Sequence, residues 1–458
     1  GDLFYRSGVD TILGELTSSN GSAGVVTGND ILDAAAGSND FNLDIRGGTG
    51  VLLQAGNGVG TFDDKLVTDG SNLASTATSG GINLLEIGDV SINDVSLSAA
   101  RISLDSSSLA QAVSLSDLTT TAGNGDIALA AEDNLTVNDG TLTGPGAGVT
   151  AHGDGFIYLD ARTGTLALDA SIASSGGSIV IDGNDAVLAA AKGDVTTSGT
   201  GSILVESISG PIFMDDGARV VTVDSGILLR ASGNITVGGL QSGSGGVGID
   251  LLNGSVIDGG DTDLDFEGLF LILDAADFGN GGLGSAADPL EIDVDTLSSR
   301  AGAVGIFLSD SNDLTVGEVD LNITRIAYDT PPTTDSVSSQ SDLTTLNNGP
   351  ISISLPGNLT LTDGITTDDG LAIFANGSGD VTLQSDTLIQ ADAGIDGGSG
   401  SILLSAPNEV NQGIEGDLST DGSGNITVTS DTLTMTDGAV TTTVDGNIIY
   451  SAVNDLAL

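Results

Sequence analysis

The chain has 458 residues, with 63 acidic and only 10 basic side chains, which gives a formal net charge of −53. Such a chain cannot neutralise nucleic-acid phosphates or an anionic membrane surface, and no run reaches the ~18 apolar residues of a membrane span, so neither nucleic-acid binding nor membrane insertion is expected. Cysteine is absent, which excludes disulfides and thiolate metal sites, and 39% hydrophobic but only 3% aromatic residues favour a thin aliphatic core.

Two long repeats follow one another along the chain. Residues 193–207 (GDVTTSGTGSILVES) return as residues 416–430 (GDLSTDGSGNITVTS), and residues 116–120 return letter for letter as residues 341–345 (SDLTT). Residues 446–451 (GNIIYS) resemble the start of each repeat. A self-similarity at this distance indicates a tandem repeat protein. We therefore predict one continuous solenoid, with its first repeat, second repeat and the start of a third at residues 1–224, 225–445 and 446–458.

A shorter period runs inside both repeats. A glycine, a small polar residue and an apolar-x-apolar triplet recur, as in residues 125–129, 177–181, 201–205 and 424–428. Neighbouring copies are commonly some 21–26 residues apart. Alternation with period two predicts short strands with one buried face, separated by turns rich in Gly, Asn, Asp and Ser. This spacing is too short for propeller blades and too even for a sandwich, so it predicts an all-β fold, a parallel β-helix of roughly 20 coils.

Loops are expected to leave the coils at two levels. Residues 328–348 contain Pro331-Pro332 and a Ser/Thr-rich run, and proline cannot donate within an interior ladder. This stretch is therefore predicted to be a protruding loop, with residues 105–116 as its counterpart in the first repeat. Residues 56–66 and 279–290 are predicted to be a second matched pair of loops.

Acidic residues alternate along two segments of the second repeat. The first segment holds Asp261, Asp263, Asp265 and Glu267, and the second holds Glu291, Asp293 and Asp295. Period two places each set on one face, and clustered carboxylates suit a hard cation such as Ca²⁺. The segment lacks the spacing of an EF-hand loop, so a solvated acidic face is favoured over an ordered calcium site. The candidate metal ligands are Asp261, Asp263, Asp265, Asp293 and Asp295; no cofactor is expected to be required.

The sequence offers little material for catalysis. His152 is the only histidine, and it stands in a glycine-rich turn sequence. Paired aspartates occur, but none has a basic partner close by in the sequence, and the Arg or Lys bases that β-helix lyases usually need are scarce. An acid/base site also needs two groups with separated pKa values. The chain is therefore not expected to be an enzyme, and a glycan-active site around His152 is the least favoured alternative.

Several segments resemble the repeats of a known class of exoprotein. Residues 254–258 (GSVID), 269–273 (LFLIL) and 314–317 (LTVG) resemble large bacterial exoproteins of the filamentous-haemagglutinin type. The GNITV and DNLTV strands resemble the same group and autotransporter passengers. The resemblance implies a right-handed parallel β-helix, export across a Gram-negative envelope and a surface or adhesive role.

These observations favour a structural extracellular protein. The main hypothesis is a fibre or filament subunit, secreted to the cell surface, whose partner is another copy stacked head to tail or the adjacent repeats of a longer chain. The alternative is a cell-surface adhesin passenger that binds glycans or neighbouring surfaces through lateral loops. That alternative predicts aromatic residues on one exposed ridge, with Phe156, Tyr158, Tyr328 and Phe374 as the candidates.

Overall fold

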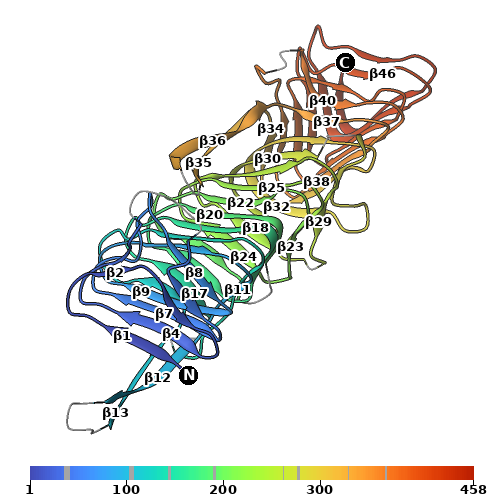
Figure 1. Cartoon of the computed structure of the whole chain (residues 1–458). Helices are drawn as coiled ribbons and strands as arrows, with labels where there is room; N and C mark the ends of the chain where they lie inside the picture. The colour runs from blue at the N-terminus through green and yellow to red at the C-terminus, as the bar shows by residue number, and fades with distance from the viewer. Residues whose placement is uncertain are drawn as a thin grey trace. The chain divides into compact units, whose positions relative to one another are not determined.

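The computed structural model describes residues 1–35, 42–102, 108–142, 146–188, 192–260, 262–275, 279–327, 330–366 and 369–458 (Figure 1). Across these residues the elements are strands, joined by turns, and none is an α-helix. Within that described part, no helix is long and apolar enough to cross a membrane. The all-β fold predicted from the period-two alternation is confirmed.

The described residues group into two compact units. Unit 1 comprises Gly1–Val223 and Thr324–Thr334, and unit 2 comprises Asp224–Ile323 and Asp335–Leu458.

Unit 1 contains mostly short strands, because the chain turns several times within each coil. The strands that lie wholly in unit 1 are, in order along the chain, β1 Leu3–Arg6, β2 Thr11–Leu13, β3 Leu16–Ser18, β4 Ser22–Val26, β5 Ile31–Asp33, β6 Ile45–Gly47, β7 Gly50–Ala55, β8 Leu66–Gly70, β9 Asn72–Ala77, β10 Ile82–Glu86, β11 Val90–Ile92, β12 Val95–Ile102, β13 Ser108–Leu115, β14 Leu118–Thr120, β15 Ile127–Ala131, β16 Leu135–Val137, β17 Ala147–Ala151, β18 Ile157–Leu168, β19 Ser171–Ser174, β20 Ile179–Leu188, β21 Val195–Thr197, β22 Ile203–Ser207, β23 Ile212–Met214 and β24 Arg219–Thr222.

The strands that follow repeat this pattern. They are β25 Ile227–Ala231, β26 Ile235–Val237, β27 Gly239–Gln241, β28 Gly246–Leu251, β29 Val256–Asp258, β30 Phe266–Ala275, β31 Gly282–Leu283, β32 Leu290–Ala301, β33 Gly305–Asp310, β34 Leu314–Val316, β35 Val319–Ala327, β36 Thr330–Gln340, β37 Leu343–Thr345, β38 Ile351–Leu355, β39 Leu359–Leu361, β40 Leu371–Ala375, β41 Val381–Ser385, β42 Leu388–Ala391, β43 Gly394–Asp396, β44 Ile402–Ser405, β45 Glu409–Gln412, β46 Leu418–Thr420, β47 Ile426–Met435, β48 Thr441–Thr443 and β49 Ile448–Ala457.

Equivalent residues of successive coils lie in register in unit 1. Strands β15, β18, β20 and β22 pair in parallel, which places Ile127, Ile157, Ile179 and Ile203 in one column. All four side chains are fully buried. Each buried aliphatic side chain contributes about 1.5–3 kcal/mol of transfer free energy. The core is therefore a continuous aliphatic column, and the predicted parallel β-helix is confirmed.

Unit 2 contains the same kind of column. Strands β41, β44, β47 and β49 pair in parallel, and their first residues, Val381, Ile402, Ile426 and Ile448, stack in that order. The first three are at most 1% exposed, whereas Ile448 of β49 is 44% exposed.

The recurring glycine of the short period has a steric cause. In unit 1, a Cβ atom on Gly155 would overlap the carbonyl group of Gly125, one on Gly177 would overlap that of Gly155, and one on Gly201 would overlap that of Gly177. Unit 2 has a glycine column of the same kind, in which a Cβ atom on Gly446 would overlap the carbonyl of Gly424. Only glycine allows the coils to approach so closely before each strand begins.

The predicted protruding loop at residues 328–348 is largely wrong. Residues Thr330–Gln340 form β36, which pairs with β35 in a separate two-stranded sheet, while residues 328–329 lie outside the described part. The prolines fit because a strand in a two-stranded sheet is an edge strand, which does not need every N–H for pairing. Its counterpart in the first repeat, residues 105–116, likewise contains most of a strand, β13, which pairs antiparallel with β12; residues 103–107 lie outside the described part.

The β12–β13 hairpin covers one face of the coils in unit 1. Val95 and Leu97 of β12 are 2% exposed and pack on Val26, Leu52 and Ala74 of β4, β7 and β9. On this side of unit 1 the coil strands therefore carry apolar side chains on both faces, one face toward the core of the coil and the other toward the hairpin.

The second predicted pair of loops does match. Gly60 and Gly284 have φ angles of +59° and +60°, a conformation that favours glycine. After each glycine the backbone closes a small turn, through hydrogen bonds between Thr61 and Asp64 in unit 1 and between Ser285 and Asp288 in unit 2. The two loops therefore have one local structure, and they define equivalent positions in the two repeats.

Candidate functional site

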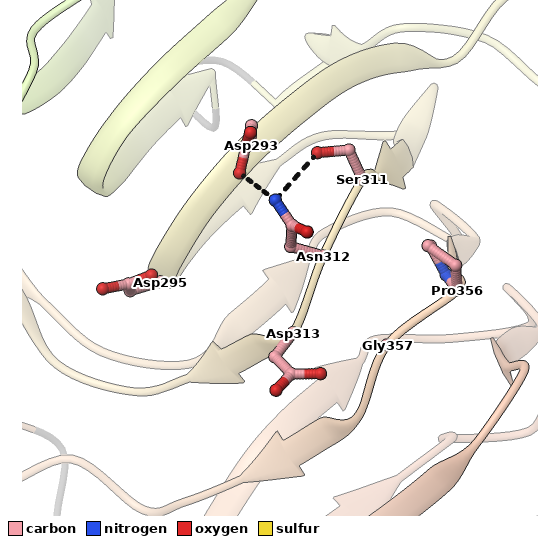
Figure 2. Close-up of a pocket in the computed structure, with 7 residues that line it drawn as sticks. All are labelled: Asp293, Asp295, Ser311, Asn312, Asp313, Pro356 and Gly357. Atoms are coloured by element: carbon pink, nitrogen blue, oxygen red, sulfur yellow. Dashed lines mark hydrogen bonds between the residues drawn. The ribbon is translucent and has the colours of Figure 1, made fainter.

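Strand β32 presents carboxylates on the outside of unit 2. Ile292 and Val294 are buried, and the intervening Asp293 and the following Asp295 point outward, as the alternation predicts. Together with Ser311, Asn312, Asp313, Pro356 and Gly357, the two aspartates line an open hollow of about 590 Å³ (Figure 2). The amide of Asn312 donates to Asp293 Oδ1 at 2.8 Å, and Asp313 Oδ1 accepts from the Asn358 N–H at 2.6 Å. The hollow offers oxygen ligands suited to a hydrated cation.

A fourth carboxyl group lies close to this hollow. Asp310, at the end of β33, is 3% exposed and accepts the Asn312 N–H at 2.7 Å. Burial raises the pKa of Asp310 to about 6, and the neighbouring negative charges of Asp293 and Asp295 add to the increase. A cation bound at the hollow would oppose this increase.

A tighter group of carboxylates forms near the ends of β29, β30 and β32. Asp258 ends β29, Asp265 precedes β30 and Glu291 lies in β32. One oxygen from each lies within 4.8 Å of the others. Asp258 and Asp265 are only 6% and 1% exposed. The Asp265 N–H donates to the Glu291 carbonyl at 2.9 Å, and Asp265 Oδ2 accepts the Glu291 N–H at 3.0 Å, so two hydrogen bonds hold Asp265 beside Glu291.

The structure separates the five candidate ligands predicted from the sequence. Asp265 joins Asp258 and Glu291, whereas Asp293 and Asp295 line the hollow further along β32. Asp263 is exposed and belongs to neither place, and Asp261 lies outside the described residues. The four candidates that the structure describes therefore do not form one site.

Sequence spacing did not identify Asp258 because its partners come from later coils. A signal was nevertheless present in the repeats. Residues 43–47 (LDIRG) correspond to residues 264–268 (LDFEG), and Asp33 corresponds to Asp258. The Val67 N–H donates to Asp44 Oδ2 at 2.7 Å, and the Glu291 N–H donates to Asp265 Oδ2 in the same way. Val67 is therefore the counterpart of Glu291.

The structure also shows where three of the other candidates lie. The ring Nδ1 of the exposed His152 lies 2.8 Å from the Gly123 carbonyl, which ties the imidazole to a turn. Tyr158 is 4% exposed and donates to Asp160 at 3.1 Å, and Phe156 packs edge-on against Phe62 with ring centroids 6.1 Å apart. Tyr158 therefore does not contribute to an exposed ridge, and Tyr328 lies outside the described residues.

The stacked parallel coils and the carboxylate groups on them define the class of protein, an acidic parallel β-helix. Comparison with models of protein families, with curated proteins and with solved structures finds no match.

Proposed function

We propose that the chain is a structural segment of an extracellular fibre, built by end-to-end stacking of β-helix coils. The carrying observation is the apolar column of unit 2. Val381, Ile402 and Ile426 are buried between coils, but Ile448, in the same column, is 44% exposed on β49. Ile449 and Leu456 of the same strand are each 49% exposed. A further coil stacked on β49 would bury these side chains and pair its backbone.

A head-to-tail contact of this kind does not close on itself, so it yields an open filament. The partner is a coil of the same type, either from a second copy or from further repeats. The high negative charge makes copies repel one another, so stacking is expected to strengthen as salt screens the surface. Secretion and the surface location remain part of this proposal, in line with the acidic, cysteine-free composition.

Replacement of Ile448 with aspartate is expected to weaken self-association by about tenfold or more. The substitution removes roughly 1.5–3 kcal/mol of apolar burial and places a charge in the interface, and 1.4 kcal/mol corresponds to tenfold in affinity. Sedimentation velocity of the intact chain, over a range of concentrations at and above 0.15 M salt, measures the effect.

Leu252→Asp is the matched control. Leu252 is 49% exposed in a turn of unit 2, so this substitution adds the same negative charge away from β49. It should associate like the wild type. A wild-type chain that stays monomeric at high concentration and high salt would contradict stacking and would favour the adhesin alternative, for which glycan binding is the next assay.

A further inference from the structure

The chain has two lysines, Lys65 and Lys192, and both lie in the first repeat. Their counterparts in the second repeat are Pro289 and Glu415. Lys65 and Pro289 follow the equivalent turns of the matched loops. Lys192 and Glu415 stand two residues before Asp194 and Asp417, whose carbonyls accept equivalent hydrogen bonds from Ile172 and Ile395. The second repeat therefore lacks an ammonium group at two positions where the first repeat has one.

The place of Lys192 can be compared in detail between the two units. In unit 1, Asp139 Oδ1 accepts the Gly146 N–H at 2.8 Å. In unit 2, Asp363 Oδ2 accepts the Gly370 N–H at 3.0 Å. The carbonyls of Gly146 and Gly370 accept in turn from Ser171 and Gly394. Asp139 and Asp363 are thus the same position of the repeat, held by the same backbone contact.

The second oxygen of this carboxylate differs between the units. In unit 1 it contacts the Lys192 Nζ at 2.6 Å, and this hydrogen bond lowers the pKa of Asp139. In unit 2 the corresponding oxygen, Asp363 Oδ1, is buried and has no hydrogen-bond partner among the residues that the structure describes. The oxygen that binds a cationic group in one repeat therefore lacks a hydrogen bond in the other.

Two more carboxylates meet Asp363 in unit 2. Oxygens of Asp342, Asp363 and Asp369 lie within 4.8 Å of one another. Asp342 is 4% exposed and has a φ angle of +66°, as does its counterpart Asp117 in unit 1. Asp369 has no acidic counterpart, because Pro145 stands at that position of the first repeat. At this place the second repeat thus lacks the lysine and has a third carboxylate.

The same difference recurs at the other lysine. In unit 1, Lys65 is 1% exposed and its Nζ donates to the Phe62 carbonyl at 2.6 Å. The second repeat has Pro289 instead of Lys65 and Glu291 instead of Val67, and Glu291 completes the group with Asp258 and Asp265. The two close groups of three carboxylates in unit 2, Asp258 with Asp265 and Glu291, and Asp342 with Asp363 and Asp369, therefore each accompany the absence of a lysine that the first repeat has.

We propose that a divalent cation of the Ca²⁺ type binds between Asp342, Asp363 and Asp369, in the place where unit 1 holds the ammonium of Lys192. Three carboxylates so close together repel one another, and a cation that all three can reach removes that repulsion. Carboxylate oxygens are the ligands that Ca²⁺ prefers, and water can complete its coordination.

Calorimetric titration of the intact chain with Ca²⁺ in 0.15 M KCl tests this site. Asp363→Asn is expected to weaken one calcium equivalent by at least about tenfold, because it removes the charge of the best-anchored ligand. Asp437→Asn, at an exposed aspartate of unit 2, changes the net charge equally and should leave that equivalent intact. This control separates the site from diffuse binding to an acidic surface.

Glu415→Lys is the second variant, since it restores the lysine of the first repeat at an exposed position. It is expected to abolish the same calcium equivalent and to raise the unfolding temperature in a chelator. If Asp363→Asn does not fold, calcium binding by Glu415→Lys tests the site alone. Retention of every wild-type calcium equivalent in folded Asp363→Asn or in Glu415→Lys would overturn the proposal, whether or not the chain forms fibres.

Discussion

Replacement of Gly177 with alanine is expected to lower the free energy of unfolding by about 3 kcal/mol. Its φ angle is not in the left-handed region, so the cost does not come from backbone strain. The added Cβ would instead overlap the carbonyl group of Gly155, one coil earlier, and the coils would have to separate. Because Gly201 stacks on Gly177 in the same way, a local shift would pass to the next coil. Thermal and denaturant unfolding measure the loss.

Gly88→Ala is the matched control for this prediction. Gly88 also lies in a turn of unit 1, and a Cβ there would have no neighbour within 4 Å. This variant should be as stable as the wild type or slightly more stable, since alanine restricts the unfolded chain. Equal losses of unfolding free energy in the two variants would contradict the explanation that close contact between coils excludes a Cβ atom at Gly177.

Replacement of Glu86 with glutamine is expected to stabilise the protein more and more as the pH rises from about 5 to 8. Glu86 ends β10 and is 1% exposed, with its oxygens accepting from the Thr68 hydroxyl at 2.7 Å and the Gly70 N–H at 3.0 Å. Burial raises its pKa to about 8 from a normal value of 4.5. The folded state therefore holds a proton that the unfolded state has already released.

The sign follows from this difference in proton binding. Below pH 4.5 both states are protonated and Glu86 contributes its full stability, which is then lost as the pH rises towards 8. Each unit of pKa difference corresponds to about 1.4 kcal/mol, so the total loss is on the order of 3–5 kcal/mol. Glutamine keeps the shape and one acceptor, and its amide can donate to Thr68, so this loss should disappear.

Denaturant unfolding of the wild type and Glu86→Gln at pH 5, 6, 7 and 8 measures the difference directly, because all other carboxyl groups are shared. Glu15→Gln removes one exposed carboxylate and controls for net charge. A stability difference between wild type and Glu86→Gln that does not change with pH would contradict the assignment of a buried, protonated Glu86.

The fold was largely predictable because one physical rule repeats in every coil. Glycine before an apolar-x-apolar triplet indicates close stacking followed by a half-buried strand, and the structure places Ile127, Ile157, Ile179 and Ile203 in one column. The sequence did not predict the hairpin β35–β36, because Pro331-Pro332 is incompatible with an interior strand. That inference holds for interior strands and fails for an edge.

The candidate site was predictable only in part. Alternation along β32 correctly placed Asp293 on an outer face, because alternation is a property of one strand. The meeting of Asp258, Asp265 and Glu291 depends on which coils lie side by side, and that is not encoded in the spacing along one segment. Comparison of the repeats with each other carries this information, since Lys65 and Lys192 are missing from the second repeat where the carboxylates gather.

Electron cryo-microscopy of the intact chain, at the salt concentration where it associates, tests the central claim most directly. The account predicts fibres whose strands lie across the fibre axis, with a spacing of about 4.8 Å along that axis that continues through the junction between copies. Isolated particles, or fibres in which the 4.8 Å spacing runs across the axis because copies pack side by side, would contradict end-to-end stacking.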